Sequence, residues 1–95
     1  MNSERFEQQF AELVHAFVAI TTPEAMVAFL HDLCTTAELG AMSQRFEVAR
    51  LVKEGHSYQE ISRVTGASTA TVTRVAHALK YGDGGYGTVL KEEFQ

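Results

Sequence analysis

The side chains with the clearest chemical use lie in the run from Gly66 to Val75, which reads GASTATVTRV. Hydroxyl groups can hydrogen bond to DNA phosphates or base edges, and an arginine can pair with both acceptor atoms of a guanine. A methyl side chain can contact the methyl group of thymine. We therefore predict a DNA-reading surface made by five residues of this run: Ser68, Thr69, Ala70, Thr73 and Arg74.

Two short helices joined at Gly66 would present these side chains to solvent. Ser57 and Glu60 have the spacing of a capping box, which begins the first helix. Gly66 suits the left-handed turn that ends it, and Ser68 can cap the second helix. A helix-turn-helix is therefore predicted over residues 57–80, with its helices ending near Thr65 and Tyr81. Small or branched residues fill its inner positions: Ile61, Ser62, Val72 and Val75.

The charge distribution supports a DNA-binding surface on the predicted helix-turn-helix. The whole chain has a formal net charge of −4. Residues 44–81, however, carry six Lys or Arg side chains and three Glu, a local charge of +3. A local positive field attracts the phosphate backbone. The predicted phosphate contacts are Arg50, Lys53, Arg63 and Lys80, and His56 and His77 are weaker candidates.

Three further helices are predicted before the helix-turn-helix. Apolar residues recur at helical spacing over residues 4–20, and Thr22-Pro23 is a typical helix start for residues 23–33. A third helix begins at Thr35 or Thr36 and ends at Gly55. Its predicted buried stripe is Leu39, Met42, Phe46, Ala49 and Val52.

The C-terminal segment, residues 82–95, begins with a glycine-rich turn. Four glycines lie between Tyr81 and Gly87, and glycine disfavours the helix interior. We expect a hinge or specific turn there, and residues 88–94 can form a last short helix. The prediction is one all-α domain of five to six helices over residues 1–95, because the chain is too short for two.

Several other functions lack the residues that they require. The four histidines and Cys34 lack the spacing of a metal site, and no catalytic set of side chains is recognisable. We therefore predict that the protein is not an enzyme and uses no cofactor or metal. No apolar run is long enough to span a membrane, and the N-terminus lacks the features of a signal peptide. A single cysteine fits a cytoplasmic protein.

From Leu33 to Leu90 the chain resembles the Trp repressor-like family, in its YerC/YecD branch. The resemblance lies in Asp32–Thr35, Gln44–Ala49, Gly66–Val72 and Tyr81–Tyr86. It implies an all-helical, intertwined homodimer whose N-terminal helices, residues 1–33, provide dimerisation. It also implies two reading heads that present their second helices to successive major grooves of DNA.

The resemblance also implies a ligand pocket between Arg45 and Arg74, which match the two arginines that hold tryptophan in the Trp repressor. Val75 and Ala78 stand where that pocket has a glycine and a serine. These replacements remove space for the indole and a partner for the ammonium group. They disfavour tryptophan as a corepressor, and we expect both arginines to serve phosphates instead.

The function predicted from the sequence is therefore a sequence-specific regulator that binds double-stranded DNA, a homodimeric repressor acting on a palindromic operator. Two alternatives remain open. The scaffold can serve protein interaction through the aromatic-rich first helix, or it can sense a small aromatic or amine ligand between Arg45 and Arg74.

Overall fold

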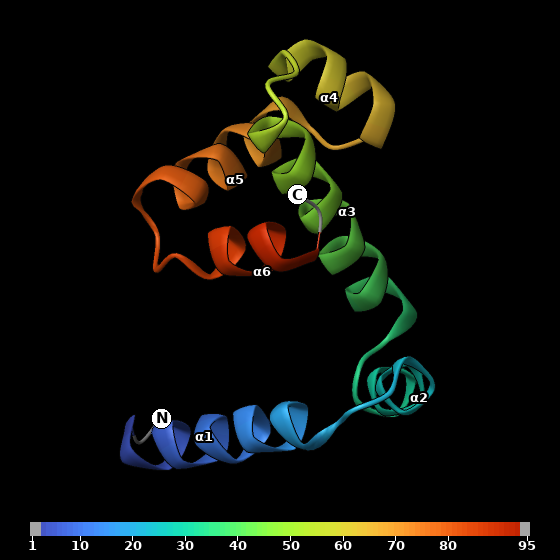
Figure 1. The fold of residues 1–95 in the computed structure, drawn as a ribbon, viewed down its shortest axis with the longest axis vertical. Coiled ribbons are helices and arrows are strands. Elements are labelled where there is room, and N and C mark those ends of the chain that lie inside the picture. The colour runs from blue at the N-terminus through green and yellow to red at the C-terminus, as the bar shows by residue number, and fades with distance from the viewer. Residues whose placement is uncertain (1–2, 94–95) are drawn as a thin grey trace. The chain divides into compact units, whose positions relative to one another are not determined.

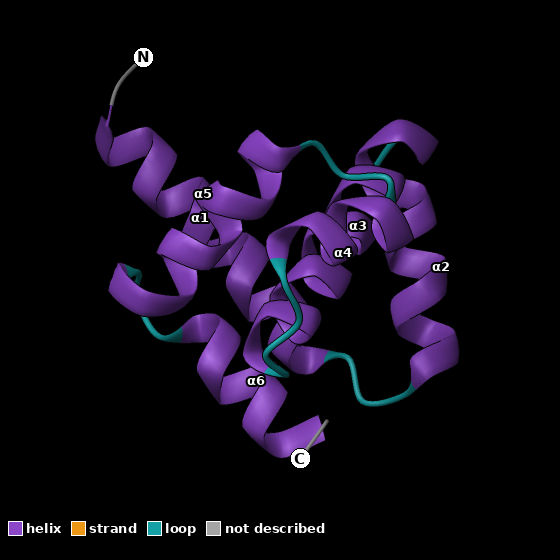
Figure 2. Cartoon of the chain, turned by 90° about the horizontal axis from the view of Figure 1, so that it is seen from above, coloured by secondary structure: helices purple, strands orange, loops and turns teal. Residues whose placement is uncertain are grey.

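The computed structural model describes the backbone of residues 3–93 and the side chains of residues 3–91. The described part contains helices and no strand (Figure 2), which confirms the all-α prediction. Phe94, the predicted end of the last helix, lies outside the described residues. Figure 1 labels six helices: α1 (Ser3–Ala19), α2 (Pro23–Leu33), α3 (Thr36–Lys53), α4 (Tyr58–Thr65), α5 (Thr69–Tyr81) and α6 (Gly85–Glu93).

The chain forms two compact units, residues 1–36 and residues 37–95. The first, here called the N-terminal unit, contains α1 and α2. Thr22 caps α2, because its side chain accepts a hydrogen bond from the Ala25 N–H at 3.1 Å, and Pro23 follows at the first helical position. Phe17 and Phe29 join the two helices edge to face, with ring centroids 5.4 Å apart.

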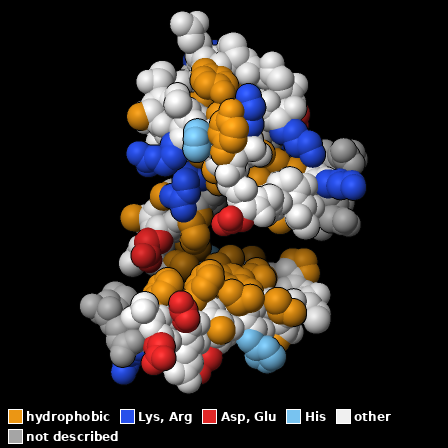
Figure 3. All heavy atoms as spheres, turned by 90° about the vertical axis from the view of Figure 1, so that its left-hand side faces the viewer, with side chains coloured by type: hydrophobic (Ala, Val, Ile, Leu, Met, Phe, Trp, Pro, Cys, Tyr) orange, Lys and Arg blue, Asp and Glu red, His pale blue; other side chains and the backbone are white. Residues whose placement is uncertain are grey.

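No residue of α1 or α2 is buried in the chain by itself. Phe6 and Phe10 stack on each other on α1, with centroids 5.8 Å apart, yet Phe10 remains 55% exposed. Figure 3 shows many hydrophobic side chains at the surface of this unit. Two helices that bury so little apolar surface gain little stability from packing on each other.

The second unit, here called the head, consists of nearly all of α3 together with α4, α5 and α6. Its core contains seven buried residues, all apolar: Val48, Ala49, Ile61, Ala67, Val72, Val75 and Leu90. Each of these four helices contributes to the core.

The predicted buried stripe of α3 is partly wrong. Ala49 is buried and Phe46 and Val52 pack against the core, but Val48 is buried as well and Met42 is 38% exposed. The core of the head contacts only the C-terminal half of α3. The helical spacing predicted an apolar face on α3, but it did not indicate how much of the helix is covered by other helices.

The glycine-rich segment is shorter than predicted, because α6 begins at Gly85 and not at Thr88. Gly84 adopts φ 83°, and its carbonyl accepts hydrogen bonds from both the N–H and the hydroxyl of Thr88, each at 3.1 Å. Leu90, two residues after Thr88, is 1% exposed. Burial of this leucine stabilises the helix and offsets the cost of Gly85 and Gly87 within it.

Two alanine substitutions in this segment should have opposite effects. A Cβ on Gly82 would lie 2.4 Å from the Ala78 carbonyl oxygen, whereas a Cβ on Gly87 would meet nothing within 4 Å. We expect Gly82→Ala to lower the free energy of unfolding by more than about 1 kcal/mol, and Gly87→Ala to raise it by about 0.5–1 kcal/mol. Urea denaturation at equal protein concentration measures both, and equal stability of the two variants would contradict this account.

Candidate nucleic-acid interface

The turn between α4 and α5 fixes how these helices cross. Gly66 adopts the predicted left-handed conformation, with φ 77°, and its N–H donates to the Ser62 carbonyl at 2.9 Å. The Ser62 hydroxyl donates to the Ala67 carbonyl at 2.6 Å. The small residue predicted within the first helix therefore also ties that helix to the turn.

Three further hydrogen bonds hold this turn, and one of them joins residues that are distant in the sequence. The Thr65 hydroxyl donates to the Ile61 carbonyl at 2.7 Å and accepts from the Ala67 N–H at 3.1 Å. The Gln44 amide donates to the Thr65 carbonyl at 3.2 Å and so connects α3 to the turn. Since 21 residues separate Gln44 from Thr65, only the fold brings them together.

The two faces of α5 differ sharply. Its inner face contributes Val72 and Val75 to the core, where Ile61 of α4 and Ala67 of the turn are also buried. Its outer face is exposed and has a shallow depression. Four of the predicted reading residues, together with His77, line it: Thr69, Ala70, Thr73 and Arg74.

Ser68 caps α5 as predicted. Its hydroxyl oxygen accepts from the Thr71 N–H at 3.1 Å and also lies 3.1 Å from the Thr71 hydroxyl. Because this oxygen already satisfies the helix terminus, Ser68 differs from the other reading residues in having a structural role as well.

The predicted phosphate contacts fall into two classes. Arg50 pairs with Glu54 at 3.1 Å, and the same carboxylate lies 3.3 Å from His56. Arg63 pairs with Glu60 through two hydrogen bonds. Lys53 and Lys80, in contrast, form no ion pair with any side chain of residues 3–91, although the Lys80 ammonium lies 5.4 Å from the centre of the Tyr81 ring.

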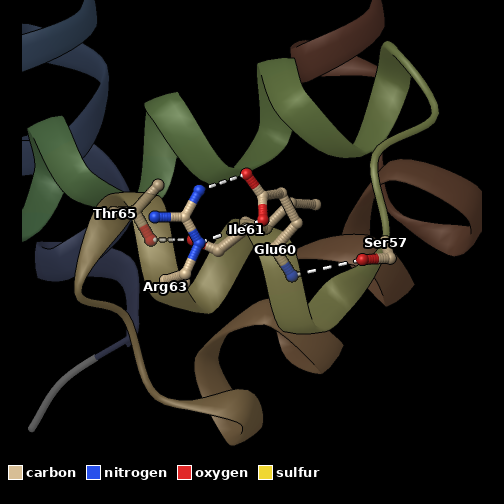
Figure 4. Close-up of polar contacts among 5 residues, drawn as sticks. All are labelled: Ser57, Glu60, Ile61, Arg63 and Thr65. Carbon is tan, nitrogen blue, oxygen red and sulfur yellow. Dashed lines mark hydrogen bonds and ion pairs between the residues drawn. The ribbon is translucent and has the colours of Figure 1, made fainter.

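The pair of Glu60 and Arg63 replaces half of the predicted capping box (Figure 4). The Ser57 hydroxyl accepts from the Glu60 N–H at 3.2 Å, as the box requires, but the Glu60 carboxylate accepts from Arg63. The hydrogen bond from Arg63 lowers the pKa of Glu60, and the bond to Glu60 raises the pKa of Arg63. The pair is thus charged at neutral pH and is lost only as acid titrates Glu60 below its ordinary pKa.

Removing the Glu60 carboxylate should release Arg63 for DNA. We expect Glu60→Gln to tighten binding to every DNA sequence by about the same factor, roughly twofold to fivefold, because one more unpaired cation faces the phosphates. Fluorescence anisotropy with specific and random duplexes measures this. Glu24→Gln on α2 removes the same charge outside the head and is the control. Equal tightening by both variants would show an effect of net charge alone.

The predicted ligand pocket between Arg45 and Arg74 has no counterpart in the depressions that these residues line. Arg74 lines the depression on the outer face of α5, which does not include Arg45. A separate pocket between α3, α5 and α6 includes Phe46, Asp83 and Tyr86 and neither arginine. The pocket between the two arginines therefore stays a prediction.

Among the side chains of residues 3–91, no three His, Cys, Asp or Glu are grouped so that they could hold a metal ion. No helix in the described part of the chain has the length and apolar character needed to cross a membrane.

Known proteins resemble this chain over most of its length. The model of a family described as Trp repressor protein matches residues 8–94. The uncharacterized protein YerC of Bacillus subtilis (strain 168) is 39% identical over 83 residues, which cover 87% of this chain and 80% of that protein.

Solved structures agree with the sequence comparison. The crystal structure of a TrpR-like protein from Eubacterium eligens ATCC 27750 matches with a TM-score of 0.87 and 37% identity, covering 96% of this chain and 94% of that one. A second solved structure, from Staphylococcus aureus, has a TM-score of 0.86 and 35% identity, covering 97% and 93% of the two chains.

Proposed function

Since the chain belongs to the Trp repressor family, in the branch that includes YerC, we propose that it is a repressor that acts as a homodimer on a palindromic operator. The family is one of helix-turn-helix, DNA-binding regulators. The finer proposal concerns how this chain reads DNA, in what assembly, and with what effect on transcription.

The observation that carries the proposal is the division of α5 into two faces. Val72 and Val75 fix the helix in the core, whereas Thr69, Thr73 and Arg74 are exposed beside one another. A helix of this kind can enter the major groove without disturbing its own packing. We assign base contacts to Thr69, Ala70, Thr73 and Arg74, and a contact near the helix start to Ser68.

Phosphate contacts would position the head on the duplex. Lys53 and Lys80 can contact phosphates directly, because no carboxylate competes for them within the described chain. Arg50 and Arg63 would exchange their glutamate partners for phosphate oxygens. Exposed ion pairs of this type contribute little free energy, so the exchange costs little.

Dimerisation would cover the apolar face of α1. Phe6, Phe10 and Val14 are exposed at helical spacing on this face, and no residue of α1 is buried. An isologous contact with the same face of a second copy would bury these side chains. Two heads related by a twofold axis would then require a palindromic site.

Selection from random double-stranded DNA tests the proposal directly. Purified protein is mixed with a random duplex library at two salt concentrations without added ligand, and the bound molecules are sequenced. We expect a palindromic motif with half-sites about one helical turn apart and binding that weakens steeply with salt. No enrichment at either salt concentration would contradict the proposal and favour a protein-interaction role for the apolar face of α1.

A further inference from the structure

A pocket on the head lies apart from the outer face of α5 and combines an apolar floor with two lysines. It measures about 430 Å³, within the roughly 300–1,000 Å³ typical of small-molecule sites. The apolar residues Val52, Ala76 and Leu79 are here called its floor, and Lys53, Lys80, Tyr58 and Gly87 complete the lining. Helices α3, α4, α5 and α6 thus all contribute, so the site exists only in the folded head.

The lysines of this pocket are the two predicted phosphate contacts that no carboxylate of residues 3–91 neutralises. Arg50 and Arg63 are paired with Glu54 and Glu60, whereas Lys53 and Lys80 form no ion pair with a described residue. The Lys80 ammonium lies 5.4 Å from the centre of the Tyr81 ring, and Tyr81 is largely exposed. Two unneutralised ammonium groups beside an apolar floor favour an anion that has an apolar body.

The pocket with the two lysines differs in the charge of its lining from the pocket between α3, α5 and α6. The pocket between α3, α5 and α6 has Phe46 and Tyr86 in its lining, but its one charged side chain is Asp83. A carboxylate ligand would be repelled there. In the lysine pocket the Tyr58 hydroxyl adds a hydrogen-bond donor to the two ammonium groups.

We propose that the pocket formed by Val52, Lys53, Tyr58, Ala76, Leu79 and Lys80 binds a small organic carboxylate with an aromatic or branched apolar body. The carboxylate would lie between the two ammonium groups, and the apolar body would cover Val52 and Leu79. This site is separate from the expected pocket between Arg45 and Arg74.

Binding of the carboxylate would also regulate DNA binding, an inference that rests on the proposed function. Lys53 and Lys80 are assigned to phosphates, and a bound carboxylate would neutralise both of them. The ligand would therefore weaken DNA binding on every sequence and reduce its salt dependence, because fewer counterions are released when DNA binds. Such a ligand acts as an inducer and not as a corepressor.

The binding test uses the full chain and 3-phenylpropionate as the probe. Amide resonances in ¹H–¹⁵N spectra are followed during titration with 3-phenylpropionate, with the neutral 3-phenylpropanamide, and with acetate. We expect saturable shifts at Lys53, Tyr58, Leu79 and Lys80 with a dissociation constant on the order of millimolar. Binding of the amide should be at least about tenfold weaker, and acetate should not saturate, because each lacks one half of the recognised group.

Matched variants locate the ligand. The double variant Lys53→Gln, Lys80→Gln should lose binding of 3-phenylpropionate by at least about tenfold, since both charges that select the carboxylate are gone. Lys91→Gln, on α6 outside the pocket, should bind as the original protein does. Equal affinity for the acid and the amide, or shifts that map to Phe46 and Tyr86, would overturn the proposal. So would shifts at the lysine pocket that appear on raising protein concentration alone, because a second copy would then occupy it.

DNA binding is measured separately, so that the two proposals fail in different ways. Saturable binding of 3-phenylpropionate without any DNA motif would support the ligand site and overturn the proposed function. A palindromic motif without ligand binding would do the reverse. With both present, saturating 3-phenylpropionate should weaken DNA binding by at least about tenfold, and an unchanged DNA affinity would overturn the inducer step.

Discussion

Replacing Phe10 with aspartate is expected to raise the dissociation constant of the homodimer by about 100-fold or more and to abolish binding to the full palindrome. Phe10 is 55% exposed and stacks on Phe6, so its free face is available to a partner. Each phenyl group buried at the interface contributes about 1.5–3 kcal/mol to the free energy of dimerisation. The substitution removes two such groups, because the dimer contains two copies of Phe10. The introduced carboxylates would also have to be desolvated. Sedimentation at several protein concentrations measures the change.

Gln8→Asp is the matched control, because it places the same charge on the opposite side of α1. This control should stay dimeric and bind DNA. Circular dichroism should show that the helices of Phe10→Asp are largely retained, since the core of the head contains no residue of α1. A Phe10→Asp protein that remains dimeric at low concentration would rule out the apolar face of α1 as the interface.

Replacing Arg74 with alanine should have the largest effect on sequence specificity. Arg74 is exposed on the outer face of α5 and forms no ion pair with any side chain of residues 3–91, so its guanidinium is available to a guanine. We expect Arg74→Ala to reduce the free energy of binding to the selected operator by about 1–3 kcal/mol. It should also relax the base preference at one base pair of each half-site. Binding is measured on the operator, on single-base variants and on a random duplex.

Lys53→Ala is the comparison for Arg74→Ala, because a phosphate contact carries no sequence information. Lys53→Ala should weaken binding to all duplexes by about the same factor. It should also make the affinity for DNA less dependent on salt concentration. If Arg74→Ala also weakened binding to every duplex by the same factor, the assignment of Arg74 to a base contact would be wrong. Arg74 would then be a phosphate contact.

Features that depend on neighbouring residues were predictable from the sequence. Thr22 and Pro23 begin α2, Ser57 begins α4, and Gly66 ends it in the left-handed conformation, all as predicted. Each follows from a local rule, in which a hydroxyl satisfies a free N–H or a glycine accepts a positive φ. For this reason α4 ends at Thr65 and α5 ends at Tyr81, as predicted.

Features that depend on distant residues were not predictable in the same way. The buried length of α3 depends on where α4, α5 and α6 pack against it, and Met42 lies beyond that region. The early start of α6 depends on burial of Leu90 in a core formed by other helices. Two local features were missed as well, because the sequence predicted Arg50 and Arg63 as phosphate contacts without their ion pairs to glutamates three or four residues away.

The separation of the two faces of α5 has a consequence for how related regulators diverge. The residues that would discriminate among operators, Thr69, Ala70, Thr73 and Arg74, contribute nothing to the buried core. A duplicated gene can therefore change all four while Ile61, Val72 and Val75 keep the helix in place. New binding specificities can then arise with little loss of stability, so paralogues can share a scaffold and control different genes.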